Sequence, residues 1–124
     1  LNIYYFPTPK IEDGTKNSKL IKLYHKYYIT LPIRIIKYAD NYKSNFFYPS
    51  TIFVETKCLS TYASIKLKAE KDINKLKYIK NKVKIVRMPR INTKQNLFLL
   101  NTKLPNFSEL LLDNKKFRDA TFFY

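Results

Sequence analysis

The feature of this sequence that most constrains its fold is a stretch without acidic residues, which runs from Ile73 to Ser108. Its 36 residues include nine Lys or Arg side chains and no Asp or Glu. Lysines on an exposed helix normally pair with Glu at i,i+4 positions, and here no Glu is present to pair with them. We therefore expect the stretch to present its positive charge to a partner that carries many negative charges.

The pattern of apolar residues around this stretch changes its period twice. Ser64 to Ala69 alternates apolar and basic side chains, which predicts a strand. Asp72 to Lys82 spaces its apolar residues three positions apart with lysines between them, which predicts a helix. Val83 to Arg87 alternates again, so a second strand is expected to follow the helix.

A basic hairpin is expected after this second strand. Met88, Pro89 and Arg90 interrupt the apolar pattern. The polar residues 92–96 then form a tip, and the apolar residues 97–100 return as a strand. The predicted helix and the tip carry most of the charge of this region.

The N-terminal half contains weaker patterns. Lys19 to Thr30 has apolar residues at helical spacing beside lysines, which predicts a short helix. Pro32 is expected to end this helix, because proline disrupts helix interiors. The β-branched run from Ile33 to Tyr38 predicts a strand, Asp40 to Ser44 a turn, and Pro49 to Lys57 another strand.

Both ends of the chain are aromatic. Leu1 to Phe6 precedes two prolines that favour an extended path, and its Tyr and Phe side chains are expected to pack on the core or on a neighbouring protein. Near the other end, Ser108 can cap a short helix over residues 109–113. The Phe and Tyr residues of 117–124 are expected to pack against the protein.

These patterns predict an α+β fold with a small mixed sheet and one or two short helices. A chain of 124 residues is long enough for one domain. Residues 1–62 are expected to form an N-terminal extension with a short helix and strands. Residues 63–124 are expected to form a basic α+β core with a hairpin and an aromatic C-terminus.

The net charge of +15 narrows the classes of partner. A compact fold with that charge repels itself, so nucleic acid is the first expected partner and an anionic membrane surface the second. Lys, Asn, Ile, Tyr and Phe make up more than half of the chain, and there are 20 Lys but only four Arg. Such residues have AT-rich codons, as in many organelle genomes, and the initial Leu1 fits either a trimmed sequence or a non-standard start codon.

No set of residues supports catalysis, a metal or a cofactor. His25 and Cys58 are each the only residue of their kind and belong to no nucleophile–base motif. Glu70 and Asp72 lie at the start of the predicted helix, where they suit the positive end of its dipole. A single cysteine excludes an internal disulfide, and no apolar run is long enough to cross a bilayer. We expect no enzyme activity, no small-molecule substrate and no membrane insertion.

Basic side chains interleaved with aromatic ones are the remaining functional signal. Lysines that neutralise phosphates release counterions, so such binding is strong and depends on salt. Arg87 and Arg90 suit phosphates because a guanidinium group can donate two parallel hydrogen bonds. Tyr and Phe can stack on unpaired bases, although the sequence singles out none of them. The predicted RNA-binding residues are Lys75, Lys80, Lys82, Lys84, Arg87, Arg90, Lys94 and Lys103.

The composition resembles that of organelle-encoded ribosomal proteins, and residues 64–103 resemble the S-ten family of small-subunit ribosomal proteins. That family has a strand reading like I-R-L-K-A, which residues 65–69 match, and a hairpin with a Leu-Pro pair, in whose place Met88-Pro89-Arg90 stands. Residues 97–102 stand where the return strand of that hairpin begins. The Ser-Pro-His turn of the family and its second full helix have no counterpart here.

The resemblance implies a ferredoxin-like α+β domain whose extended basic hairpin reaches between rRNA helices of the small subunit. The chain would then be a structural constituent of the mitochondrial ribosome that supports translation, with rRNA and neighbouring ribosomal proteins as its partners. A peripheral basic subunit of a mitochondrial respiratory membrane complex is the main alternative. A small DNA-binding protein is a further one, although the sequence lacks a recognition-helix or zinc motif.

Overall fold

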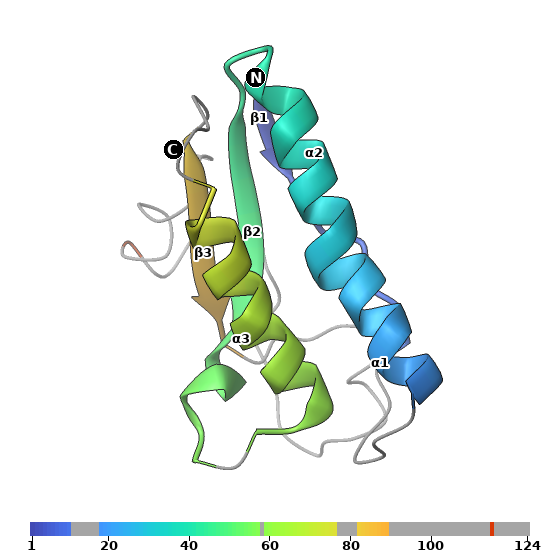
Figure 1. Ribbon diagram of the computed structural model, residues 1–124. Helices are drawn as coiled ribbons and strands as arrows, with labels where there is room; N and C mark the ends of the chain where they lie inside the picture. The colour runs from blue at the N-terminus through green and yellow to red at the C-terminus, as the bar shows by residue number, and fades with distance from the viewer. Residues whose placement is uncertain (11–17, 58, 77–81, 90–114, 116–124) are drawn as a thin grey trace.

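The computed structural model describes residues 1–10, 18–57, 59–76, 82–89 and 115, which form a layer of helices on a small sheet (Figure 1). The sheet has three parallel strands in the order β1 (Asn2–Tyr4), β2 (Asn45–Thr51) and β3 (Val83–Met88). The expected combination of a small sheet with helices agrees with this architecture. A mixed sheet was expected, whereas the strand pairs within the described residues are all parallel.

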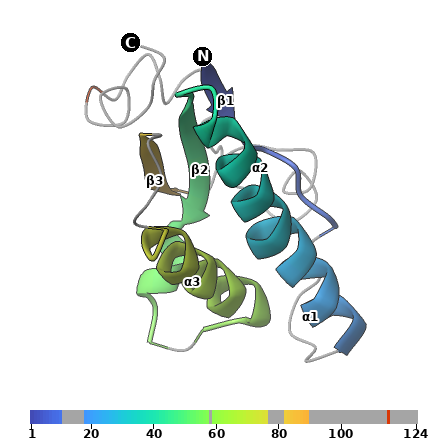
Figure 2. The same cartoon turned by 45° about the horizontal axis from the view of Figure 1, so that its top comes forward.

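Two helical segments connect the strands and lie on one face of the sheet (Figures 1 and 2). The first joins β1 to β2 and consists of α1 (Ser18–His25), a π-helical turn η1 (Lys26–Thr30) and α2 (Leu31–Asp40). The second, α3 (Thr61–Asn74), joins β2 to β3. Crossovers between parallel strands share one hand, so two crossovers that step in the same direction place their helices on the same side.

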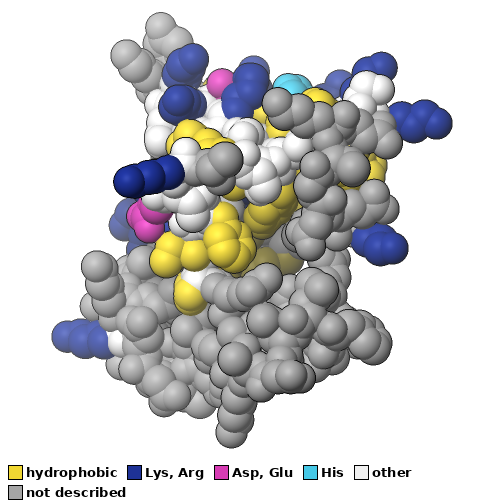
Figure 3. Space-filling view, turned by 90° about the horizontal axis from the view of Figure 1, so that it is seen from below, with side chains coloured by type: hydrophobic (Ala, Val, Ile, Leu, Met, Phe, Trp, Pro, Cys, Tyr) yellow, Lys and Arg dark blue, Asp and Glu magenta, His cyan; other side chains and the backbone are white. Residues whose placement is uncertain are grey.

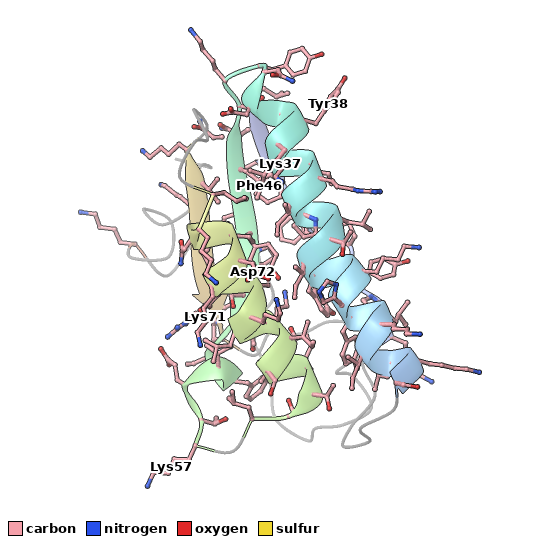
Figure 4. The ribbon with its side chains drawn as sticks, in the orientation of Figure 1. Lys37, Tyr38, Phe46, Lys57, Lys71 and Asp72 are labelled. Atoms are coloured by element: carbon pink, nitrogen blue, oxygen red, sulfur yellow. The ribbon has the colours of Figure 1, made fainter. Side chains whose placement is uncertain are left out.

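The main core lies between the helical layer and β2. Phe46 and Tyr48 alternate along the strand and therefore point to the same face of the sheet. They are fully buried and pack in one cluster with Ile36 of α2 and Ile73 of α3. Figure 4 shows Phe46 directed from β2 toward α2. This single cluster joins both helical segments to the central strand.

The N-terminal aromatic residues pack on both faces of the sheet. Tyr5 is buried in the main core, as expected for this segment. Tyr4 and Phe6 lie on the other face, where their ring centroids are 5.8 and 6.0 Å from that of Phe47. Since β1 pairs with β2 and β2 with β3, the sheet takes strands from both sides of residue 62.

The first helical segment continues through Pro32 into α2, so the predicted stop at this proline and the predicted strand over residues 33–38 are wrong. Pro32 has no N–H and leaves the carbonyl of Tyr28 without its usual helical partner. Tyr48 of β2 donates its hydroxyl to that carbonyl, at 2.8 Å. A side chain from the sheet thus replaces a hydrogen bond that the helix cannot make for itself.

A tyrosine hydroxyl also serves an unpaired carbonyl in the π-helical turn before α2. Its wider hydrogen-bond pattern directs the N–H of Leu31 to the carbonyl of Lys26 and away from that of Tyr27. The hydroxyl of Tyr5 donates to the carbonyl of Tyr27, at 2.5 Å. Because tyrosines from the N-terminal segment and β2 serve both carbonyls, α1, η1 and α2 form one continuous segment (Figure 1).

The helix α3 covers residues 64–69, where the sequence pattern predicted a strand, and it ends at Asn74 rather than continuing to residue 82. Ser60 begins it by accepting a hydrogen bond from the N–H of Ala63, at 3.1 Å. The residues that α3 buries are Ala63, Lys66, Ala69, Glu70 and Ile73, which is helical spacing. The alternation was misleading because it assigned Lys66 to the solvent, and this lysine faces the core.

Two strand predictions and one turn prediction lie close to the observed elements. The predicted strand over residues 83–87 is confirmed as β3. The strand expected over residues 49–57 begins earlier, at Asn45, and ends at Thr51. There the hydroxyl of Thr51 accepts the N–H of Phe53 and begins a short 3-10 turn, η2 (Ile52–Glu55). The turn expected over residues 40–44 is present between α2 and β2.

Several other predictions fall on residues outside those described. They are the hairpin tip at 92–96, its return strand at 97–100, the capped helix at 109–113 and the aromatic segment 117–124.

Candidate nucleic-acid interface

The outward sides of α1 and α2 carry a row of cations, which we call the α1–α2 cationic face. The sides that meet the core bury Leu20, Tyr24 and Ile36. The opposite sides expose Lys19, Lys22, Lys26, Arg34 and Lys37. At 1.5 Å per residue the row from Lys19 to Lys37 is about 27 Å long, so the cations follow most of the helical segment formed by α1, η1 and α2.

This face has no carboxylate of its own. Between residues 18 and 39 the sequence contains no Asp or Glu. The described carboxylates are Asp40, Glu55, Glu70 and Asp72, and three of these four are in ion pairs elsewhere: Glu55 and Glu70 with Arg87, and Asp72 with Lys68. Seen from below, Lys and Arg side chains project at several points around the described part of the molecule (Figure 3).

The second basic region lies on α3 and β3, where four of the predicted RNA-binding residues are described. Lys75 is exposed at the C-terminal end of α3, and Lys82 is exposed just before β3. Lys84 lies within β3, is half-buried and already has an interaction within the fold. The predicted contacts Lys80, Arg90, Lys94 and Lys103 lie outside the described residues.

Arg87, the fourth of these residues, is part of an internal ion-pair network. Its Nε and Nη2 donate to the two carboxylate oxygens of Glu70, at 3.1 and 3.0 Å. Its Nη1 donates to Glu55 at 3.1 Å. The network joins β3 to α3 and η2, so the role that the structure supports for Arg87 is to hold the fold together. RNA contact by this residue stays a prediction.

The Glu70 carboxylate is stabilised in its ionised form. Burial by itself raises the pKa of Glu70, but the hydrogen bonds and charge of Arg87, together with the nearby Lys66, bring the pKa below its ordinary value. Its hydrogen bonds to Glu70 and Glu55 raise the pKa of Arg87, which therefore remains charged. Since one member is buried, this pair is expected to matter more for stability than an exposed one.

Beneath the cationic surfaces lies a buried lysine surrounded by tyrosines. Lys66 is only 4% exposed, and its Nζ donates to the carbonyl of Pro49 at 2.6 Å. The same nitrogen lies 4.2, 4.8 and 5.8 Å from the ring centroids of Tyr28, Tyr48 and Tyr62. We call these four side chains the Lys66 cluster. The ring faces attract the ammonium group and partly replace its lost hydration.

Burial perturbs the titration of the whole Lys66 cluster. It lowers the pKa of Lys66 to about 7, although the charge of Glu70 opposes the shift. Burial raises the pKa of Tyr62 to about 12 and also raises the pKa values of Tyr28 and Tyr48. A perturbed lysine often marks an active site. Here the amine is enclosed by protein, so no substrate from solvent reaches it, and we interpret the cluster as part of the core.

The other candidates for chemistry give no site in the described part of the chain. His25 is exposed, and its Nδ1 lies 3.1 Å from the hydroxyl of Thr30. The described residues contain no group of three or more His, Cys, Asp or Glu side chains that could hold a metal ion. They also contain no helix that is both long enough and apolar enough to span a membrane.

The sequence did not predict the α1–α2 cationic face, because the longer acid-free stretch at residues 73–108 was taken as the interface. A signal was available: from Gly14 to Ala39 the chain contains no Asp or Glu and six basic residues. The predicted strand over residues 33–38 would have placed Arg34 and Lys37 on opposite faces of a sheet. Only a helix that continues through Pro32 places both on one outward side.

Comparisons with known proteins identify no relative. No protein-family model matches the chain, and neither the curated proteins nor the solved structures include a significant match.

Proposed function

We propose that this chain is a structural, non-catalytic constituent of the mitochondrial ribosome that binds rRNA through its exposed lysines. The observation that carries the proposal is the α1–α2 cationic face, a row of exposed cations from Lys19 to Lys37 that is about 27 Å long, with no Asp or Glu between residues 18 and 39. Exposed cations without carboxylates among them raise the local positive potential and attract a polyanion.

RNA is the polyanion that best fits this surface. The described cations are almost all lysines, which bind phosphates as point charges and do not require a fixed base sequence. The cations lie along one continuous helical segment, so they can contact successive phosphates of an RNA backbone. The mitochondrial location is supported by the AT-rich codon bias that the composition implies.

The proposal also includes a basic hairpin, a place in the small subunit and a ferredoxin-like domain. A basic hairpin that includes Lys94 and Lys103 would extend the interface beyond β3. Assignment to the small subunit and a ferredoxin-like domain rest on the resemblance to the S-ten family. That resemblance required a strand at residues 65–69, which are helical, and the described strands are all parallel. The proposal therefore depends on the charged surface more than on the resemblance.

A binding experiment with matched charge variants tests the proposal. The triple variant Lys22→Gln, Lys26→Gln, Arg34→Gln removes three cations from the α1–α2 cationic face. The control variant Lys10→Gln, Lys57→Gln, Lys115→Gln removes three exposed cations elsewhere. Affinity for a structured RNA is measured by fluorescence anisotropy over a range of salt concentrations.

We expect the first variant to reduce the slope of log affinity against log salt by about 2 to 3, because each lost phosphate contact removes about 0.9 from the slope. The control variant is expected to lower the slope by less than about 1. If both variants lower the slope equally, the charge acts only in bulk and the α1–α2 cationic face is not the interface.

A further inference from the structure

Two exposed tyrosines stand at the end of the α1–α2 cationic face, at its junction with β2. Tyr38 lies in the last turns of α2 and is 67% exposed, and Tyr42 lies in the following turn and is 63% exposed. Their ring centroids are 5.5 Å apart, with an angle of 49° between the ring planes. Figure 4 shows Tyr38 near the end of α2, directed away from the sheet. Two exposed rings side by side form an aromatic patch, and patches of this kind can mark a binding surface.

The two tyrosine side chains contact each other. The hydroxyl oxygens of Tyr38 and Tyr42 lie within hydrogen-bond distance of each other, at 3.3 Å. The N–H groups of Tyr42 and Lys43 donate to the carbonyls of Ala39 and Asp40, at 3.0 and 3.3 Å. The backbone hydrogen bonds and the contact between the rings place the two side chains next to each other on the surface.

The turn that carries Tyr42 is conformationally strained. Lys43 adopts a φ of 52°, in the left-handed region that residues with a Cβ normally avoid. A glycine or an asparagine would be the ordinary choice there. Strain of this kind is often found at binding sites, where it positions neighbouring side chains. Lys43 directly follows Tyr42 in the sequence, and its side chain is exposed.

Cations surround the pair on its own segment. Arg34 precedes Tyr38 by one helical turn and therefore lies on the same side of α2, and Lys37 and Lys43 are also exposed. Asp40 is the one carboxylate of this region; it is half-buried and has an interaction of its own within the fold. Exposed aromatic rings with cations on the same surface are the combination by which proteins hold single-stranded nucleic acid.

We propose that Tyr38 and Tyr42, together with Arg34, Lys37 and Lys43, form a platform on which unpaired RNA bases stack. The rings contact the bases, and the cations contact the phosphates on either side. The inference rests on the proposed RNA-binding function and adds the kind of RNA that this end of the molecule recognises. The α1–α2 cationic face binds folded RNA through phosphates, and the platform binds an unpaired segment beside it.

The experiment compares three nucleic-acid probes, and phosphatidylglycerol vesicles as a further ligand, across three forms of the full chain. The probes are a short single-stranded oligouridylate, an abasic oligonucleotide of the same length and an RNA duplex. The proteins are the wild type, the double variant Tyr38→Ala, Tyr42→Ala and the control Tyr38→Phe, Tyr42→Phe, which keeps the rings and loses the hydroxyls. Circular dichroism and thermal unfolding check that each form is folded.

We expect the alanine variant to bind the oligouridylate about 10- to 100-fold more weakly than the wild type, as for the loss of stacking on one or two bases. Binding to the abasic probe and to the duplex should change by less than about twofold, because phosphate contacts remain. The phenylalanine control should bind all three probes like the wild type.

Three results would overturn the inference. An unchanged affinity of the alanine variant for oligouridylate would show that the tyrosines do not stack on bases, while the proposed RNA-binding function would stand. An equal loss for the abasic probe shows that the tyrosines support the fold or the charge and do not stack on bases. A loss of binding to phosphatidylglycerol vesicles with unchanged RNA binding assigns the pair to a membrane surface. If the wild type binds none of the RNA probes, the proposed function itself fails.

Discussion

Substitution of Lys66 by Met tests the account of the core most severely. Lys66 is the one described cation that is almost fully buried, and burial lowers its pKa from 10.5 to about 7. Below pH 7 the folded and unfolded states both carry the proton, so the cost of burying the ammonium is fully present. Above pH 7 the folded state releases the proton while the unfolded state keeps it, so stability rises with pH.

The size of this rise follows from the pKa. Each pH unit above 7 adds at most about 1.4 kcal/mol, so between pH 7 and pH 9.5 the ceiling is about 3 kcal/mol. We expect a rise close to this ceiling, because the linkage depends only on the pKa of Lys66 in the folded and unfolded states. The rise in stability with pH ends near pH 10. There the tyrosines of the unfolded state ionise, whereas burial in the folded state raises the pKa of Tyr5 and of Tyr62 to about 12, so stability falls again.

The assay is urea denaturation followed by circular dichroism at several pH values from about 6.5 to about 9.5. The wild type is expected to gain stability over this range, and Lys66→Met is expected to lose most of that gain. In the variant the Pro49 carbonyl loses its donor, which destabilises the fold by about 1 to 3 kcal/mol independently of pH. Near pH 7 the variant also removes the cost of burying the ammonium, so the slope against pH, and not the stability at one pH, is the result that decides. Lys68→Met, which removes an exposed lysine of the same helix, is the matched control and should keep the wild-type slope. Equal slopes for the wild type and Lys66→Met would refute the reasoning.

Two further predictions concern single contacts, both measured by urea denaturation near neutral pH. Arg87→Ala leaves the buried carboxylate of Glu70 unpaired and should lower the free energy of unfolding by about 2 to 4 kcal/mol. Glu55→Gln, at the exposed end of the network, should lower it by less than about 1 kcal/mol. Similar losses for the two variants would show that burial of Glu70 does not determine the strength of the network. Tyr48→Phe removes the donor to the Tyr28 carbonyl and should cost about 1 to 2 kcal/mol, and an unchanged stability would mean that this carbonyl needs no partner from the sheet.

The sequence predicted some elements because local chemistry alone determines them. β3 combines alternation with β-branched residues, and both favour a strand. The turn after α2 has Asp, Asn and Ser within a few residues, which commonly form turns. The helix from Lys19 onward had regular apolar spacing. In each case the residues that set the structure are neighbours in the chain.

The failures occurred where a distant residue decides the local structure. Pro32 lies within a helical segment because the hydroxyl of Tyr48 donates to the carbonyl of Tyr28, which the proline cannot do. Tyr48 lies outside residues 18–40, so the pattern of those residues could not indicate this contact. Residues 64–69 form a helix whose Lys66 side chain faces the interior. There it lies over the rings of Tyr28 from η1 and Tyr48 from β2. A reading that assumes lysines face solvent assigns the wrong period to this segment.

The same difference affects the candidate interface. The acid-free stretch predicted Lys75 and Lys82 as exposed cations, and both are exposed. It also predicted Arg87, whose guanidinium is bonded to two carboxylates that are distant in sequence. The α1–α2 cationic face became visible only when α1, η1 and α2 were known to form one continuous segment.

The measurement that tests the central proposal most directly is sedimentation of the native protein from a mitochondrial lysate in the presence of magnesium, with and without ribonuclease. We expect the protein to migrate with the small ribosomal subunit and to be released from it by ribonuclease. Migration with a detergent-solubilised membrane complex, unchanged by ribonuclease, would contradict the ribosomal proposal and favour a respiratory-complex subunit.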